Sequence, residues 1–281
     1  MKEQSEHDLG ELSDREPAEL AIESGSDSIS DMLSAIRSRT PARVLSGRTG
    51  SSYRTSTLLN LRYDHAAARD AVWAEVDLER DLGPELVKRL SIFEVRSKAA
   101  SKEEYLLRPD LGRRFDEASR SAVATKCKSG AELQIVIGDG LSAAAVAAQV
   151  PRLLLALDEA ARSAGWRVGN AFFIRHCRVG ILNEIGDLLD PEVVVLLVGE
   201  RPGLATAESL SAYMAYRPRT GHNDANRNLI SNIHGRGVLL ADAVTRILGL
   251  ALKMRELKLS GVTVKEDLPL LDNPRCDSLP G

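Results

Sequence analysis

Leu133-Gln134-Ile135-Val136-Ile137-Gly138-Asp139-Gly140-Leu141-Ser142-Ala143 is the stretch of this 281-residue sequence that decides its fold. A short apolar run, rich in β-branched residues, passes into a turn with two glycines, and residues 142–150 then favour a helix. Ser142 is the type of residue that caps the N-terminus of a helix. The stretch therefore predicts a buried strand, a tight turn and a helix, in that order.

Two further apolar runs repeat this pattern, at residues 171–174 and 193–198. Continuous apolar runs are typical of strands that are covered on both faces, as in a parallel sheet. Between the runs, residues 152–165 and 181–189 carry Leu, Ile and Ala at helical spacing. This alternation of strands and helices predicts an α/β fold with a doubly wound, mainly parallel sheet over residues 91–262.

The segments on either side of this domain differ from it in composition. Residues 1–40 contain ten acidic and four basic side chains, and we expect residues 1–26 to be an acidic disordered tail. Residues 27–90 indicate a small all-α domain without strand-like alternation, whose first helix ends at Pro41. The last residues, 263–281, predict a flexible C-terminal tail.

Charge and cysteine content exclude several classes of protein. The 37 basic and 40 acidic residues leave a formal net charge of −3, which argues against a general nucleic-acid binder. No apolar stretch approaches the roughly 18 residues of a membrane-spanning helix, and the acidic start lacks the apolar core of a secretory signal. Cys127, Cys177 and Cys276 lie far apart without a C-x-x-C pair, which excludes a disulfide framework and a thiolate zinc site. We therefore expect a soluble, cytoplasmic protein that binds neither nucleic acid nor membranes.

The turn after the first apolar run is one candidate site. Gly138, Gly140 and Ala143 match the G-x-G-x-x-A pattern of dinucleotide-binding turns, which require an acidic residue about 20 positions later at the end of the next strand. Asp158 and Glu159 have this spacing, but they fall inside the predicted helix. An NAD-type oxidoreductase domain is therefore one alternative, beside a plain glycine turn and a ligand-binding loop of an open α/β sheet.

A second candidate loop, residues 199–203, follows the third apolar run. Its Glu200 carboxylate can accept hydrogen bonds from amide or hydroxyl groups of a ligand, unless the loop is a surface turn in which Glu200 pairs with Arg201. The chain has no G-x-S-x-G nucleophile motif, and we interpret the isolated His222 and His234 as packing or capping residues. The sequence thus predicts ligand-binding loops without catalytic or metal-ligating residues, as in a subunit that holds a cofactor for another chain or in a non-catalytic binding module.

Six stretches of the chain form a further pattern when they are taken together in order. They are Thr40-Pro41-Ala42-Arg43-Val44 with Gly47-Arg48-Thr49-Gly50, Phe93-Glu94-Val95-Arg96-Ser97, Leu107-Arg108-Pro109-Asp110-Leu111-Gly112-Arg113-Arg114, Ile137-Gly138-Asp139-Gly140-Leu141-Ser142, Leu197-Val198-Gly199-Glu200-Arg201-Pro202-Gly203-Leu204 and Ile230-Ser231-Asn232-Ile233-His234. This ordered set closely resembles the small (light) chain of ethanolamine ammonia-lyase over residues 28–260. Several motifs in one order are far more specific than any one of them alone.

The resemblance implies an adenosylcobalamin-dependent enzyme that converts ethanolamine to acetaldehyde and ammonia by a radical mechanism. In that family the large chain is a barrel that carries the substrate site and the residues that handle the radical. The small chain is implied to have a helical N-terminal domain and a Rossmann-like domain, which covers part of the cobalamin at the interface between the two chains. The family also implies a hexamer of heterodimers, and some of its members lie inside bacterial microcompartments.

The resemblance carries cofactor contacts to three positions, Val179, Glu200 and Leu229. Val179 is implied to line the cofactor, and Glu200 to accept a charge-assisted hydrogen bond from a corrin amide. Leu229 stands where other members have Cys, which favours a main-chain or apolar contact there. The chain lacks Asp-x-His-x-x-Gly, so we expect the cofactor to keep its own benzimidazole as the lower cobalt ligand. The remaining alternative is a non-catalytic assembly subunit whose cofactor contacts are incidental.

Overall fold

The computed structural model describes residues 23–40 and 44–266 of the chain. Most of the two predicted tails, residues 1–26 and 263–281, and the helix end at Pro41 lie outside the described residues. Where the tails are described, the prediction is wrong. Residues 23–26 already belong to helix α1, and Val264 is buried in the main core while Glu266 pairs with Arg246. Among the helices of the described ranges, none combines the length and the apolar character needed to cross a bilayer.

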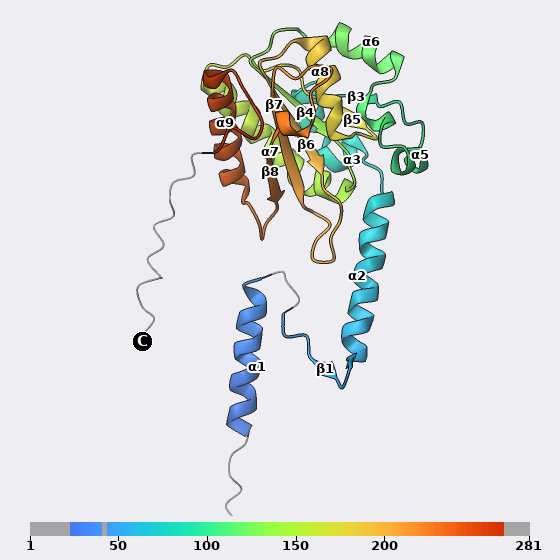
Figure 1. The fold of residues 1–281 in the computed structure, drawn as a ribbon, viewed down its shortest axis with the longest axis vertical. Helices are drawn as coiled ribbons and strands as arrows, with labels where there is room; N and C mark the ends of the chain where they lie inside the picture. Colours follow the sequence, from blue (N-terminus) through green and yellow to red (C-terminus); the bar gives the residue numbers. More distant parts are fainter. Residues whose placement is uncertain (1–22, 41–43, 267–281) are drawn as a thin grey trace, which may run out of the picture.

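The centre of the molecule is a six-stranded sheet in the order β3-β5-β4-β6-β7-β8 (Figure 1). Strands β3, β5, β4 and β6 pair in parallel, and β7 and β8 continue the sheet antiparallel. The strands are β3 (Phe93–Arg96), β4 (Leu133–Gly138), β5 (Phe172–Arg175), β6 (Val193–Gly199), β7 (Leu210–Tyr216) and β8 (Asn228–Ile233). The fold is therefore mixed α/β with a mainly parallel sheet, which confirms this part of the prediction.

Helices cover both faces of the sheet because its central strands are apolar on both sides. Every residue of β4 and of β6 is buried. Successive residues of β4 point to opposite faces, so that Ile135 packs in one core with α7 and α9 while Val136 packs in a second core with α6 and α8. The covering helices are α6 (Glu117–Lys126), α7 (Ala143–Ser163), α8 (Leu182–Leu189) and α9 (Leu240–Leu257).

The N-terminal segment combines helices with a short hairpin. Its elements are α1 (Glu23–Ser38), β1 (Arg48–Thr49), β2 (Ser52–Tyr53), α2 (Thr55–Trp73), α3 (Leu78–Leu82) and α4 (Pro84–Arg89). The prediction of an all-helical segment is wrong at the hairpin, because Gly47 and Gly50 adopt left-handed backbone with φ of 57° and 61° and turn the chain there. Helices α1 and α2 extend away from the sheet (Figure 1), and α2 buries no residue. Leu82 and Leu86, in contrast, join the main core.

Strands β7 and β8 have no clear strand signature in the sequence. β7 contains Ser211, Ala212 and Ala215 where strands usually carry larger residues, and β8 contains two asparagines, Asn228 and Asn232, which are uncommon in strands. β7 covers the edge of β6, with which it pairs over its full length, and β8 then pairs with β7. Four short elements complete the fold, α5 (Lys102–Leu107), η1 (Leu111–Arg113), η2 (Val179–Ile181) and η3 (Asp224–Asn226).

Candidate functional site

The loops after β4 and β6 lie in direct backbone contact at the carboxyl end of the parallel strands. A Cβ on Gly140 would lie 2.3 Å from the Gly199 carbonyl oxygen, and a Cβ on Gly199 would lie 2.2 Å from the Ser142 carbonyl oxygen. The Leu141 N–H also donates to the Gly199 carbonyl at 3.0 Å. Both glycines are therefore required for packing between the two predicted ligand loops.

Asp139 joins the loop after β4 to the loop after β5. Its carboxylate accepts hydrogen bonds from the backbone N–H groups of His176 and Cys177, both at 2.8 Å. These bonds support His176 in a left-handed conformation with φ of 57°. Burial raises the pKa of the Asp139 carboxyl, although the buried Lys102 ammonium and the two N–H groups act in the opposite direction. Asp139 thus positions the segment that leads to Val179.

Val179, Glu200 and Leu229 converge on one pocket of about 390 Å³. Val179 begins η2, Glu200 follows β6 and Leu229 lies on β8, so the three side chains come from separate segments of the chain. Leu229 is 43% exposed, which leaves its side chain open to an apolar contact with another molecule. The structure therefore brings together all three residues that the sequence comparison singled out.

Three hydrogen bonds hold the Glu200 carboxylate in place. Its Oε1 accepts from Ser211 Oγ at 2.6 Å and from the Asn232 N–H at 2.9 Å, and its Oε2 accepts from Ser209 Oγ at 2.8 Å. Because a carboxylate oxygen can accept two hydrogen bonds, Oε2 retains the capacity to accept one from a ligand. The alternative pairing of Glu200 with Arg201 does not form, although the structure describes both residues.

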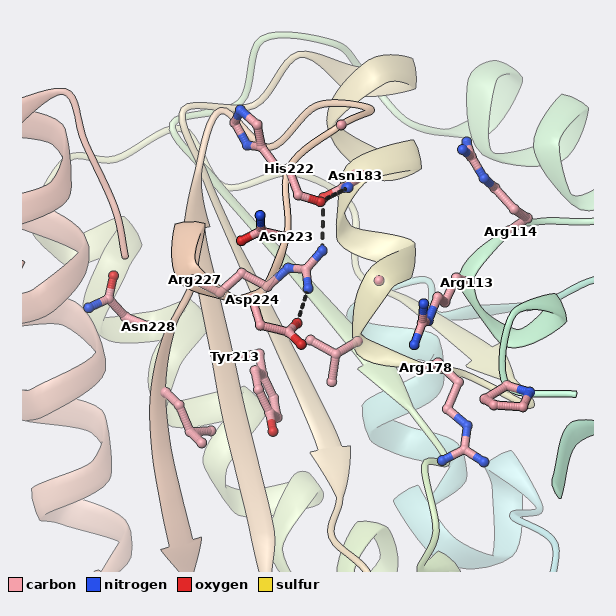
Figure 2. A pocket seen from close by; sticks show the side chains of 15 residues that line it. Arg113, Arg114, Arg178, Asn183, Tyr213, His222, Asn223, Asp224, Arg227 and Asn228 are labelled. Atoms are coloured by element: carbon pink, nitrogen blue, oxygen red, sulfur yellow. Dashed lines mark hydrogen bonds and ion pairs between the residues drawn. The ribbon is translucent and has the colours of Figure 1, made fainter. Parts of the chain in front are cut away.

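A second pocket of about 780 Å³ adjoins the first, and both are lined by Arg178, Val179, Tyr213 and Leu229. Asp224 is its only acidic lining residue within the described ranges. The wall of this larger pocket also carries the arginine side chains shown in Figure 2, which are Arg113, Arg114, Arg178 and Arg227. The larger pocket is therefore positively charged.

Tyr213 and Arg227 are candidate site residues that no sequence signal marks. Burial raises the pKa of the Tyr213 phenol, and the nearby carboxylates of Asp224 and Glu200 act in the same direction. Arg227 pairs with Asp224 and donates from Nη2 to Asn183 Oδ1 at 3.1 Å (Figure 2). These residues lie on β7 and just before β8, so they reach the site only through the antiparallel extension of the sheet.

Two buried histidines, His176 and His234, make structural contacts, whereas His222 lines the larger pocket and its Nδ1 is buried without a hydrogen-bond partner. His234 Nε2 lies 2.8 Å from Asn232 Oδ1, and its Nδ1 accepts from the Arg236 N–H at 3.2 Å. The His176 ring stacks on Tyr105 with 5.6 Å between the ring centroids. Within residues 23–40 and 44–266, no group of three or more His, Cys, Asp and Glu side chains is placed to hold a metal ion.

Comparison with known proteins identifies the family. The profile of the family described as ethanolamine ammonia-lyase light chain (EutC) matches residues 30–265. The chain belongs to this family. It is 41% identical over 230 residues to the ethanolamine ammonia-lyase small subunit of Clostridium perfringens, covering 82% of this chain and 76% of that protein. The small subunits of Clostridium acetobutylicum (40% identity over 233 residues, 83% of this chain and 94% of that protein) and Listeria monocytogenes (42% over 230 residues, 82% and 76%) are similar to it as well.

Membership of the ethanolamine ammonia-lyase light-chain family confirms the resemblance and makes this chain a subunit of an ammonia-lyase. The family membership also argues against the alternative of an NAD-type oxidoreductase domain. The glycine pattern has a packing explanation, because a Cβ on Gly138 would lie 2.7 Å from Cys177 Sγ and Gly140 lies against the next loop. Ser142 caps α7 by accepting from the Ala145 N–H at 3.1 Å.

Proposed function

We propose that this small subunit holds adenosylcobalamin against the large, barrel-type subunit, and that the pocket of Val179, Glu200 and Leu229 contacts the corrin ring. The observation that carries the proposal is the convergence of these three side chains on one pocket at the carboxyl edge of the sheet. Open α/β sheets bind their ligands at this edge. When bound, adenosylcobalamin supplies the radical chemistry of the reaction through its cobalt–carbon bond.

The chemistry of the pocket suits the edge of a corrin ring. Val179 and Leu229 offer apolar contacts to the hydrocarbon of the ring, while Glu200 Oε2 offers an acceptor to the N–H of a peripheral amide. A hydrogen bond with an ionised acceptor is stronger than one between neutral groups. Because a corrinoid is much larger than a pocket of about 390 Å³, this chain can enclose only part of it. This difference in size supports a cofactor that is held between two subunits.

The proposal extends to the assembly. The cofactor-contacting domain is a Rossmann-like, doubly wound unit over residues 91–262, preceded by a segment at 27–90 that combines helices with the β1–β2 hairpin. The cofactor keeps its own benzimidazole as the lower cobalt ligand. Six pairs of small and large subunits form the enzyme, which works in the cytoplasm or inside a bacterial microcompartment. Mass measurement of the reconstituted complex tests the hexamer, and a mass that does not correspond to six subunit pairs would reject it.

Equilibrium binding of hydroxocobalamin to the two-subunit complex tests the role of the pocket. Glu200→Gln keeps the size of the side chain and removes its charge. We expect it to weaken binding about fivefold, since hydrogen bonds to charged groups contribute roughly 1 kcal/mol more than neutral ones. Glu208→Gln is the matched control, because Glu208 is exposed on the loop that follows and lines neither pocket. The affinity of this control should equal that of the unchanged protein.

An assembly subunit with incidental cofactor contacts would behave differently. The Glu200→Gln and Glu208→Gln complexes would then bind hydroxocobalamin equally well, and this result would reject the proposed role. Lyase activity gives a second readout, with none expected from the isolated chain and activity expected after mixing with the large subunit. Turnover of ethanolamine by the isolated chain would contradict the division of roles between the subunits.

A further inference from the structure

Two arginines on the wall of the larger pocket are held in place by two glycines. The Arg178 N–H donates to the Gly112 carbonyl at 2.8 Å, which joins η1 to the start of η2. A Cβ on Gly112 would lie 2.5 Å from Arg178 Cγ, and a Cβ on Gly180 would lie 2.8 Å from Arg113 Cγ. Each arginine therefore lies over the glycine of the other segment, and this arrangement brings both side chains to one wall of the pocket (Figure 2).

The Arg178 guanidinium is oriented but has donor capacity left. It lies 4.2 Å from the centroid of the Tyr105 ring, and its Nη2 donates to the Tyr105 carbonyl at 3.2 Å. Its Nε is buried without a hydrogen-bond partner. A buried N–H without a partner is costly, so an acceptor supplied by a bound molecule would stabilise this side chain.

Two carboxylates of this region already form ion pairs with other arginines. Asp110 forms an ion pair with Arg108 at 2.8 Å, and Asp224 forms one with Arg227. Neither Arg113 nor Arg178 forms an ion pair with a carboxylate of residues 23–40 or 44–266. The pocket thus presents two guanidinium groups whose charge is not neutralised by a direct partner in the described chain.

We propose that Arg113 and Arg178 bind the phosphodiester of the cobalamin nucleotide tail, an inference that rests on the proposed function. The larger pocket adjoins the proposed corrin pocket, and Arg178 lines both. The peripheral side chains of a corrin are neutral amides, whereas the tail carries one anionic phosphodiester. The planar donor fork of arginine matches phosphate oxygens, and two forks on a concave wall suit a single anion. The corrin contact and the phosphate contact therefore belong to two adjoining pockets.

Three corrinoids separate the phosphate contact from the corrin contact. The two-subunit complex is titrated with hydroxocobalamin, with cobinamide phosphate, which keeps the phosphate, and with cobinamide, which lacks the phosphate and the nucleotide. Arg113 is exposed, so that Arg113→Gln preserves the fold, and we expect it to weaken binding of the first two ligands about 10- to 100-fold. Binding of cobinamide should stay unchanged. Arg178→Lys, which keeps the charge but not the fork, should show the same pattern with a smaller loss.

Arg152→Gln is the matched control, because Arg152 is an exposed arginine of α7 that lines neither pocket. It should bind all three ligands like the unchanged complex. The proposal is overturned if Arg113→Gln and Arg178→Lys weaken no ligand, or if they weaken cobinamide as much as cobinamide phosphate. If the two variants lose equal affinity for cobinamide and for cobinamide phosphate, and the subunits also associate more weakly, the arginines contact an acidic surface of the large subunit instead. Failure of the proposed function has a different signature, namely that Glu200→Gln leaves cobinamide binding unchanged.

Discussion

The contact between Gly140 and Gly199 leads to a quantitative prediction for Gly140→Ala. The substitution adds one methyl group to a residue with φ of 58°, and that group would lie 2.3 Å from the Gly199 carbonyl oxygen and 2.6 Å from a methyl carbon of Val198. Neither neighbour is the free end of a flexible side chain. The loop after β4 or the loop after β6 therefore has to move, and the second of these carries Glu200.

Two costs contribute to the loss of stability. A left-handed backbone costs an alanine roughly 1–2 kcal/mol relative to glycine, and forcing a methyl group into a packed contact costs roughly 1–3 kcal/mol more. Gly130→Ala separates the two, because Gly130 has φ of 74° but nothing within 4 Å of an added Cβ. We expect Gly140→Ala to lower the free energy of unfolding by about 1–3 kcal/mol more than Gly130→Ala.

Urea unfolding followed by circular dichroism measures this difference, provided that the free energy of unfolding falls with urea concentration at the same slope in the two variants. The entropy effect of alanine on the unfolded chain is the same in both and cancels. Equal losses of stability would show that the loops separate without cost, and the packing explanation of the glycine pattern would then be wrong. We also expect Gly140→Ala to weaken hydroxocobalamin binding in the complex, while Gly130→Ala leaves it unchanged.

Two further predictions concern buried and half-buried carboxylates. Asp139→Asn turns an N–H₂ group toward one of the two backbone N–H donors, which then loses its acceptor. We expect the free energy of unfolding, measured by urea titration, to fall by about 1.5–3 kcal/mol. An unchanged value would show that Asp139 does not support the loop after β5. The Arg175 guanidinium lowers the pKa of Glu94 below its ordinary value of 4.5, against the opposing effect of burial. The stabilisation from this ion pair is therefore present above pH 4.5 and lost as the pH falls through the lowered pKa of Glu94. We expect the unchanged protein to be more stable than Glu94→Gln at neutral pH and this difference to shrink in acid. A difference that is independent of pH would contradict the ion pair as its cause.

The parallel part of the fold could be predicted because its signal is local. The continuous apolar runs that became β4, β5 and β6 can be buried only if both faces of a sheet are covered, and the spacing of apolar residues in α7 marks the intervening helix. The hairpin at β1 and β2 was missed because two-residue strands carry no periodicity, and only the glycine turn remains as a signal. β7 was missed because it takes its strand conformation from pairing with β6.

For the candidate site, the family resemblance implied Val179, Glu200 and Leu229, and the structure brings the three side chains to one pocket. The anchoring of the Glu200 carboxylate by Ser209 and Ser211 could not be predicted, since it depends on the register of β7 beside β6.

The sequence by itself determined the buried strands, the glycine turn and the family, because apolar periodicity and ordered motifs are properties of neighbouring residues. Only the tertiary structure decided which distant side chains meet. Arg113 and Arg178 are far apart in the chain, and they reach one wall because Gly112 and Gly180 leave room for them. Such contacts depend on the packing of complete segments against each other, and no local pattern records that packing.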